Sequence, residues 1–284
     1  MNGTIAIIGF GEAGQALGAR RNARAFDIKT AGPDRAAKLA DYARLGVTGC
    51  ETLGEAVTGA ELILSLVTAD QALIVAEQVA AHIAQGALLC DCNSVAPDTK
   101  RAAAASIEAA GGRYVDVAVM APVLPARLAV PLLLSGAYAA EAQELLIALG
   151  FTRTRIAGDA VGQASSIKMI RSVMIKGVEA LTAECMLAAN AAGVLRQVIA
   201  SLDTDSPRAG WTDKADYNLD RMIVHGLRRA AEMEEAVKTL DALGTGSTMT
   251  RGTVDRQRAL GALRLAPPPT GLADKLRAIS EKSA

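Results

Sequence analysis

Residues 5–18 read IAIIGFGEAGQALG, and this stretch decides the fold. Apolar residues 5–8 end at Gly9, and Gly11 and Gly14 complete the pattern G-x-G-x-x-G. The pattern follows a predicted buried strand and opens a predicted helix, which is the setting of a dinucleotide cradle. There the first glycine makes a tight turn, the second lets the backbone approach a pyrophosphate, and the third allows close helix–strand packing. The helix N-terminus adds amide donors and a partial positive charge. We therefore expect cofactor contacts at Gly9, Phe10, Gly11, Glu12, Ala13 and Gly14; the alternative is a purely structural strand–helix turn.

Composition excludes several classes of partner. The chain has 284 residues, of which 51% are hydrophobic and 21% charged, and its 30 basic residues balance its 30 acidic ones. A balanced charge argues against nucleic acid and anionic membranes, and 3% aromatic residues argue against a base-stacking surface. No apolar run approaches the roughly 18 residues of a membrane span, and the N-terminus does not have the pattern of a signal peptide. Four cysteines are too few for a disulfide framework, so we expect a cytoplasmic protein with reduced thiols.

The first part of the chain alternates β-rich runs with Ala-rich helical segments. Strands are predicted at 4–10, 26–32, 61–68, 86–94, 113–120, 130–136 and 151–158. Nearly continuous apolar strands that alternate with helices indicate a parallel sheet covered on both faces. The sequence thus predicts an α/β fold with a doubly wound parallel sheet.

After about residue 160 the pattern becomes helical. Between 162 and 193 apolar residues recur every three or four positions, namely Ile167, Ile170, Met174, Val178, Leu181 and Cys185. A helix this apolar is expected to be buried, between domains or between subunits. A second long helix is predicted over 217–243, and a Pro-rich break precedes one short terminal helix. We expect a dinucleotide-binding domain at 1–160 and an all-α substrate and dimerisation domain at 161–284.

The end of the second strand bears on the type of cofactor. An acid there, about 20 residues after the glycines, would bind the ribose hydroxyls of NAD. The predicted strand 26–32 instead ends at Ala31-Gly32-Pro33, followed by Asp34 and Arg35. Arg35 could pair with a 2′-phosphate, which favours NADP, with NAD as the alternative. Otherwise Asp34 caps the next helix and Arg35 is solvated.

Beyond the glycines, four segments follow in a set order: LSLVT (64–68), DCNSVAP (91–97), DVAVMAP (116–122) and GQASSIKMIRS (162–172). This arrangement resembles the β-hydroxyacid dehydrogenase family, which includes 3-hydroxyisobutyrate and 6-phosphogluconate dehydrogenases. The resemblance covers nearly the whole chain. It implies a Rossmann domain, a helical domain and a homodimer that shares the active-site cleft. The segment at 225–244 resembles a lesser-characterised branch of the family.

The resemblance also implies roles for particular residues. Leu66, Val67 and Thr68 would lie near the nicotinamide ribose. Asn93 and Ser94 match the family's D-x-S-T-x-x-P stretch and would contact nicotinamide or substrate. Lys168 matches the catalytic lysine that follows a Gly-rich turn.

Three positions depart from the family pattern. Met120-Ala121-Pro122 replaces a substrate-binding Ser-Gly-Gly that often binds a carboxylate, so a bulkier or more apolar substrate is possible. Ser172, preceded by Arg171, replaces an asparagine one turn after the lysine. His225 stands where a lysine is found late in the helical domain.

These residues suit the oxidation of an alcohol, in which the hydroxyl proton must leave as hydride leaves carbon. An apolar helix depresses the pKa of a lysine, so Lys168 could act as general acid/base. Arg171 and Ser172 share its face, where Ser172 could hydrogen-bond the reacting oxygen and Arg171 could anchor an anionic group. Alternatively Lys168 and Arg171 snorkel at the helix edge. His225 is either an acid/base partner or a structural residue.

The sequence therefore predicts an NAD(P)-dependent oxidoreductase that acts on a hydroxyl-bearing carbon of a small molecule. No cluster of ligands indicates a metal site. Three other functions stay open. An imine reductase on this scaffold is less favoured because Lys168 is retained, whereas those enzymes generally replace the lysine. A non-redox lyase would cleave a carbon–carbon bond by retro-aldol chemistry, and the last alternative is a dinucleotide-binding module without catalysis.

Overall fold

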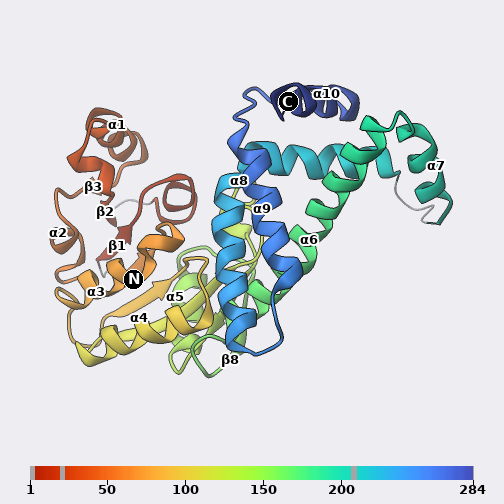
Figure 1. Cartoon of the computed structure of the whole chain (residues 1–284). Helices are drawn as coiled ribbons and strands as arrows, with labels where there is room; N and C mark the ends of the chain where they lie inside the picture. Colours follow the sequence, from red (N-terminus) through yellow and green to blue (C-terminus); the bar gives the residue numbers. More distant parts are fainter. Residues whose placement is uncertain (1–3, 20–22, 206–209, 284) are drawn as a thin grey trace. The chain divides into compact units, whose positions relative to one another are not determined.

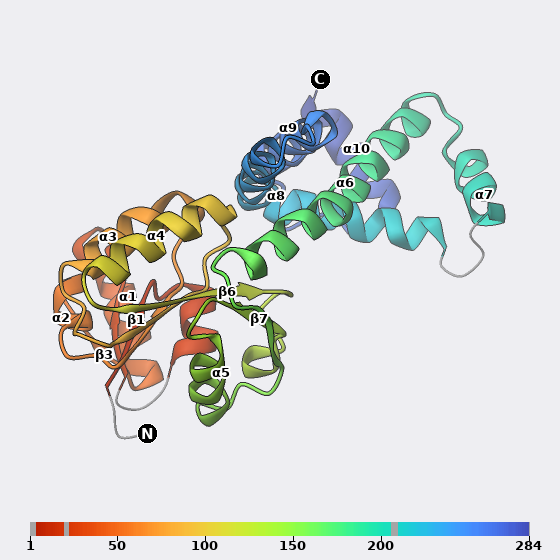
Figure 2. The same ribbon diagram turned by 90° about the horizontal axis from the view of Figure 1, so that it is seen from below.

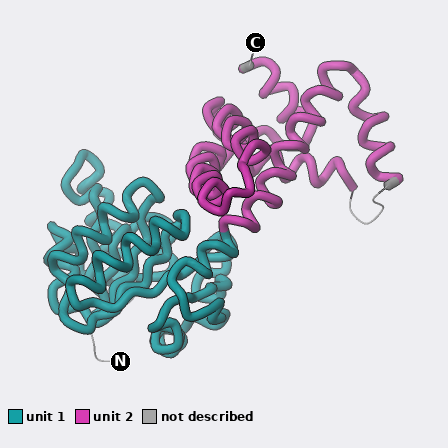
Figure 3. Tube along the Cα trace, turned by 60° about the horizontal axis from the view of Figure 1, so that its bottom comes forward, with its two compact units in different colours: residues 1–168 teal, residues 169–284 magenta. Residues whose placement is uncertain are grey.

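The structure, a computed structural model, describes residues 4–19, 23–205 and 210–283. It divides into two compact units (Figure 3), a sheet unit of residues 1–168 and a helical unit of residues 169–284. The division falls inside one long helix, α6, which spans Gln163–Ala191. Lys168 is therefore the last residue of the sheet unit.

The sheet unit is built on one eight-stranded sheet with the strand order β3-β2-β1-β4-β5-β6-β7-β8. Neighbouring strands are parallel except for the antiparallel pair β6–β7. The strands are β1 Ile5–Ile8, β2 Ala23–Phe26, β3 Thr48–Gly49, β4 Leu62–Ser65, β5 Leu88–Asp91, β6 Arg113–Val119, β7 Leu132–Ser135 and β8 Thr154–Gly158. The order reverses at β1, which pairs with β2 on one side and β4 on the other. The predicted doubly wound α/β fold is confirmed.

Apolar side chains alternate between the two faces of this sheet, as a strand buried on both sides requires. Ile5 and Ile7 of β1 belong to one core cluster, and Ala6 and Ile8 belong to the other. Helices α2, α3 and α4 pack on the Ala6 and Ile8 face, while α5 lies on the opposite face (Figure 2). The helices of this unit are α1 Arg35–Leu45, α2 Leu53–Val57, α3 Ala72–Ala80, α4 Pro97–Ala109 and α5 Ala139–Ala148.

The prediction for the second strand is wrong. Expected over 26–32, the strand lies at Ala23–Phe26, and Ile28–Ala31 form a 3₁₀ helix. The segment after the glycines ends in a short π-helical turn, Gly14–Gly18, so the chain re-enters the sheet earlier than it would after a full crossover helix. Asp27 therefore follows the strand directly, and the premise that no acid stands at this strand end is also wrong.

In the helical unit, the described residues form the rest of α6 and the helices α7 Leu195–Asp205, α8 Trp211–Ala242, α9 Thr248–Ala262 and α10 Leu272–Ser283. The predicted all-α region is thus confirmed, and the helix expected at 217–243 starts earlier, at Trp211. Helix α8 bends along its length (Figure 1), and Gly226 lies against Gly261 of α9. A Cβ at Gly226 would come within 2.3 Å of the Gln257 carbonyl oxygen, so glycine permits this close helix crossing.

The apolar stripe of α6 is not buried in the single chain. Ile167, Ile170, Met174, Val178 and Leu181 are exposed by 41%, 47%, 68%, 44% and 56%.

At the start of α8, Trp211 lies under the Lys214 ammonium, 4.6 Å from the ring centroid. Within the described residues, no helix has both the length and the apolar character that crossing a membrane requires.

Candidate active site

The turn after β1 has the geometry of a dinucleotide cradle. Gly9 has φ +88°, and a Cβ there would come within 2.4 Å of the Leu66 carbonyl oxygen. A Cβ at Gly14 would come within 2.1 Å of the Gly9 carbonyl oxygen. At Gly11, by contrast, a Cβ would meet no atom within 4 Å, so the space in front of this residue is open. The two outer glycines are required by packing, and the middle one leaves the room that a pyrophosphate needs.

Side chains from outside the turn hold its backbone at Phe10. The Phe10 amide donates to Asp27 Oδ2 at 2.7 Å, and Lys38 Nζ donates to the Phe10 carbonyl at 2.7 Å. The Phe10 ring is fully buried, 5.1 Å from the Tyr42 ring centroid. Phe10 thus anchors the turn. Its amide is already used, so the donors for a phosphate are the following amides at Gly11, Glu12 and Ala13, where a helix begins.

Asp27 was missed by the sequence analysis. The carboxylate is buried, and its Oδ1 accepts the Lys29 amide at 3.0 Å in addition to the Phe10 amide on Oδ2. The sequence does contain a signal for Asp27. It lies 18 residues after Gly9, close to the distance at which an acid is expected at the end of the second strand.

Arg35, the residue expected to bind a 2′-phosphate, is paired within the protein. Its guanidinium donates to both carboxylate oxygens of Glu51 at 2.6 Å and to the Thr30 carbonyl at 2.8 Å. The hydrogen bonds with Glu51 raise the pKa of Arg35 and lower that of Glu51. Because both side chains are exposed, this pair stabilises the fold only weakly.

The ends of β4 and β5 come together through Asn93. Asn93 Oδ1 accepts the Val67 amide at 2.7 Å, and its Nδ2 donates to Ser65 Oγ at 2.9 Å. Leu66 and Val67 are half-buried and Thr68 is exposed, at the same carboxyl edge of the sheet as Gly9. The half-buried Ser94 follows Asn93 directly. The predicted nicotinamide residues of the sheet unit therefore gather at one edge.

The segment that departs from the family pattern follows β6. The Met120 amide donates to the Pro131 carbonyl at 2.9 Å, and the Met120 side chain is half-buried. Ala121 and Pro122 are exposed. The segment thus presents a thioether and a pyrrolidine ring, and it lacks the hydroxyl and flexible amides of Ser-Gly-Gly.

Lys168 lies in the second turn of α6, whose first turn is tied to the sheet. The Ser165 amide donates to Asp116 Oδ2 at 2.9 Å, and the Ala164 amide donates to Ser135 Oγ at 3.0 Å. Lys168 is half-buried. Further along α6, Arg171 is exposed and Ser172 is buried.

A buried ion cluster of Asp91, Lys100, Tyr114 and Asp116 lies beneath the carboxyl edge of the sheet. Lys100 Nζ is 3.0 Å from Asp91 Oδ1 and 3.5 Å from Asp116 Oδ1, and Tyr114 donates to Asp91 Oδ2 at 2.6 Å. Burial lowers the pKa of Lys100, but the two carboxylates outweigh it and hold the pKa above its usual value. Burial first, and then Asp91, raise the pKa of Tyr114 well above normal. The role of Lys100 was missed because a lysine in an Ala-rich helix suggests a solvated residue.

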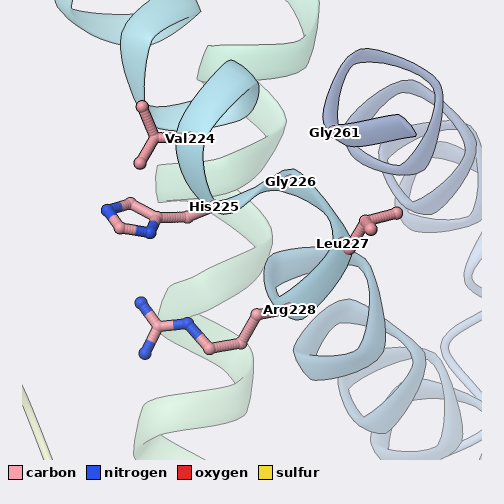
Figure 4. A pocket seen from close by; sticks show the side chains of 6 residues that line it. All are labelled: Val224, His225, Gly226, Leu227, Arg228 and Gly261. Atoms are coloured by element: carbon pink, nitrogen blue, oxygen red, sulfur yellow. The ribbon is translucent and has the colours of Figure 1, made fainter. Parts of the chain in front are cut away.

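His225 lies in the helical unit, at the bend of α8. With Arg228 it lines a pocket of about 330 Å³, whose other lining residues are Val224, Gly226, Leu227 and Gly261. The imidazole and the guanidinium point to the same side of the helix (Figure 4). His225 is half-buried and Arg228 is exposed. Across the described ranges, no group of three or more His, Cys, Asp and Glu side chains is placed to hold a metal ion.

The glycine turn, the strand reversal at β1 and the helical C-terminal region define a class: dinucleotide-binding α/β proteins with an added helical unit. A family model described as the NAD binding domain of 6-phosphogluconate dehydrogenase matches residues 4–152. A domain of unknown function, DUF1932, matches residues 189–260. The chain belongs to the family with the NAD binding domain of 6-phosphogluconate dehydrogenase, and the DUF1932 match lies in its helical unit. The resemblance expected from the sequence is confirmed.

Solved structures of other proteins share the fold of this chain. A conserved hypothetical protein from Sinorhizobium meliloti 1021 is 37% identical, over 99% of this chain and 97% of that one, with TM-score 0.77. A conserved protein of unknown function, described as similar to 3-hydroxyacid dehydrogenases, is 27% identical over 91% of this chain and 99% of its own, with TM-score 0.68. The 3-hydroxyisobutyrate dehydrogenase of Mycobacterium tuberculosis, solved with L-serine, shares the fold at 18% identity and TM-score 0.73, over 100% of both chains.

Proposed function

We propose that this protein is an NAD(P)-dependent oxidoreductase that acts on a hydroxyl-bearing carbon of a small molecule. The observation that carries the proposal is the open space at Gly11, at the same carboxyl edge of the sheet as Asn93. The first turn of α6, which precedes Lys168, is bonded to β6 and β7 of this sheet. The proposed cofactor cradle and the proposed base therefore both belong to the sheet unit.

In this proposal, the bound nicotinamide supplies the hydride acceptor or donor. Lys168 removes the hydroxyl proton during oxidation and returns it during reduction. Ser172, one turn further along α6, hydrogen-bonds the reacting oxygen, and Arg171 binds an anionic group of the substrate. His225 is a second acid/base or hydrogen-bond partner.

The segment Met120-Ala121-Pro122 bears on the substrate. A small hydroxyacid needs donors for its carboxylate, and this segment offers only its backbone amides at Met120 and Ala121. The Met120 amide already donates to the Pro131 carbonyl. We therefore propose a bulkier or more apolar substrate, with Ser94 and Met120 against its body.

For the cofactor we propose NADP, with NAD as the alternative. The acid at the second strand end, Asp27, is occupied by two backbone amides. Two exposed cations lie in the segment that follows, Lys29 paired with Asp34 and Arg35 paired with Glu51. In this proposal a 2′-phosphate replaces these carboxylates as the partner of the cations.

We further propose a homodimer formed through the exposed apolar stripe of α6, because a large exposed apolar patch marks an interaction surface. All four cysteines are free thiols, which suits the reducing cytoplasm as the proposed location.

The test of function compares Lys168→Ala and Lys168→Arg with the unchanged protein. Arginine keeps the positive charge but does not release its proton, so both variants should lower kcat by about 10²- to 10⁴-fold. The assay follows reduced-nicotinamide absorbance over a panel of hydroxyacids and their apolar analogues, and the affinity for NADPH serves as the control for folding.

Each alternative function predicts a different outcome of this assay. Full activity of Lys168→Arg would refute the acid/base role, because charge alone would then be sufficient. Reduction of cyclic imines but not of ketones would indicate the imine reductase. Product formation without an absorbance change would indicate the lyase, and NADPH binding without any turnover would leave the binding module.

A further inference from the structure

The buried ion cluster places two carboxylates and one ammonium group inside the sheet unit. Asp91 and Asp116 are directly opposite each other on neighbouring parallel strands, and both are almost completely buried. Two buried carboxylates this close repel each other unless a cation lies between them. Lys100, with no exposed surface, supplies that cation from the first turns of α4.

The cluster keeps an excess of one negative charge, and α6 offsets it. Asp116 Oδ2 accepts the amide of Ser165 in the first turn of α6, where a helix has unpaired amides and a partial positive charge. Asp116 Oδ1 accepts no hydrogen bond from the described residues and faces the Lys100 ammonium. One oxygen of Asp116 therefore fixes α6, and the other is held by Lys100.

The other carboxylate connects to the cofactor edge. Asp91 Oδ1 accepts the amide of Asn93 at 2.9 Å, and Lys100 Nζ also donates to the Asp91 carbonyl at 2.6 Å. Asn93 in turn holds the Val67 amide. Movement of Asp91 would thus displace the loops after β4 and β5 together.

We propose that Lys100 is a positioning residue for both halves of the site. Through Asp116 it fixes the first turn of α6 and so places Lys168, and through Asp91 it fixes Asn93 and so shapes the nicotinamide edge. The inference rests on the proposed function only in the roles it gives to Lys168 and Asn93.

The charges of the cluster and of Lys168 act on one thiol, that of Cys92. Burial raises the pKa of Cys92 to about 12, the charges of Lys100 and Lys168 lower it, and those of Asp91 and Asp116 raise it. These four groups belong to α4, α6, β5 and β6.

The experiment tests two arms of the cluster separately. One arm is the contact of Asp116 with α6, and the other is the contact of Asp91 with Asn93. Asp116→Ala removes the acceptor for Ser165, so kcat should fall by about 10- to 100-fold while NADPH affinity changes by less than about 2-fold. Lys100→Met disturbs both arms, so kcat and NADPH affinity should fall together. Asp116→Asn keeps an oxygen for the Ser165 amide and should restore most of the kcat that Asp116→Ala loses.

Hydrogen exchange of cofactor-free protein gives a measurement that does not depend on turnover. The amides of residues 165–168 should exchange at least about 10-fold faster in Asp116→Ala and in Lys100→Met, because an amide without its acceptor opens more readily. Glu108→Gln is the control. Glu108 lies on the same helix, α4, and is exposed, so all three readouts should stay unchanged.

If Lys100→Met does not fold, the double variant Lys100→Met/Asp116→Asn replaces it, because it retains the net charge of the cluster and an acceptor for Ser165. Equal behaviour of the Lys100 variant and Glu108→Gln in all three measurements would overturn the inference. So would a parallel loss of kcat and NADPH affinity in Asp116→Ala, which indicates general damage. If Lys168→Ala retains activity, the proposed function fails, while exchange at 165–168 and NADPH affinity still decide this inference.

Discussion

Asp27 shows how one carboxylate can occupy the position of a ribose ligand and yet serve the backbone. Both of its oxygens accept amides, one from Phe10 in the glycine turn and one from Lys29. A carboxylate held in this way fixes the shape of the turn. In the proposed binding of NADP, selectivity over NAD would come from the exposed cations of the following segment, of which Arg35 has the fork geometry for a bidentate pair with a 2′-phosphate.

Arg35 and Glu51 provide a paired test of cofactor choice. In Arg35→Ala, NADP affinity should fall by about 10-fold and NAD affinity should hold, because one charge-assisted pair is lost. In Glu51→Gln the guanidinium loses its carboxylate partner, so NADP affinity should rise. Both dissociation constants are measured by titration calorimetry, with Arg44→Ala on the same helix as the control. An unchanged NADP/NAD ratio in both variants would rule out a role for Arg35.

Single residues differ in how far the sequence predicts them. Gly9, Gly11 and Gly14 are predictable, because the demands of a tight turn depend on neighbours in the chain. Lys100 is not, because its burial depends on Asp91 and Asp116, which reach it only through the pairing of β5 with β6. The sequence alone therefore does not distinguish the fully buried Lys100 from a solvated lysine on a helix.

Among the elements, the second strand and α6 show two things that the sequence does not predict. For the strand it is the position in the chain, and for α6 it is what covers the apolar face. The strand was misplaced because the helical segment before it is short, and no residue type marks that length. The stripe of α6 was correctly recognised as apolar, but periodicity does not say what covers it. In the single chain the stripe is exposed. Coverage by a second copy is thus a proposal that the element itself suggests.

That proposal is tested by charge on the stripe. The double variant Met174→Glu/Leu181→Glu places two carboxylates on it, at positions 68% and 56% exposed. Burying them in an interface would cost several kcal/mol, so the dimer should dissociate to monomers. Light scattering with size-exclusion chromatography gives the mass. Ile147→Glu, at an equally exposed position on α5, is the control and should leave the mass unchanged. A monomeric unchanged protein at micromolar concentration would contradict the proposal.

For the whole molecule, buried acids and bases predict loss of stability at alkaline pH. The pKa of Cys92 is raised to about 12 by burial, and burial also raises those of Cys90 and Tyr114. The pKa of Lys100 is raised by its two carboxylates despite its burial. Each of these groups keeps its proton in the folded state after the unfolded chain has released it. Stability should thus be fully present below pH about 9 and fall above it, first through the two thiols and at higher pH through Tyr114 and Lys100 as well. Each group contributes a slope of about 1.4 kcal/mol per pH unit above its own unfolded-state pKa.

Urea unfolding between pH 8 and pH 12 measures this loss. Lys176 acts in the opposite direction, because burial lowers its pKa, but it stands against the four groups named above and against Tyr42 and Cys50, whose pKa values burial also raises. Tyr114→Phe should reduce the slope above pH 10, while Tyr217→Phe, which alters an exposed ring, should not. A urea midpoint that stays flat from pH 8 to pH 11 would contradict the prediction.

The lone tryptophan gives the molecule a built-in optical label. Trp211 belongs to the helical unit, with the Lys214 ammonium over its ring, whereas Tyr42, Tyr114 and Tyr138 belong to the sheet unit. Indole emission therefore reports on the helical unit alone, and the tyrosine signals are weighted towards the sheet unit. Recording both during one melt distinguishes two units that unfold in succession from a single cooperative transition, without any added dye.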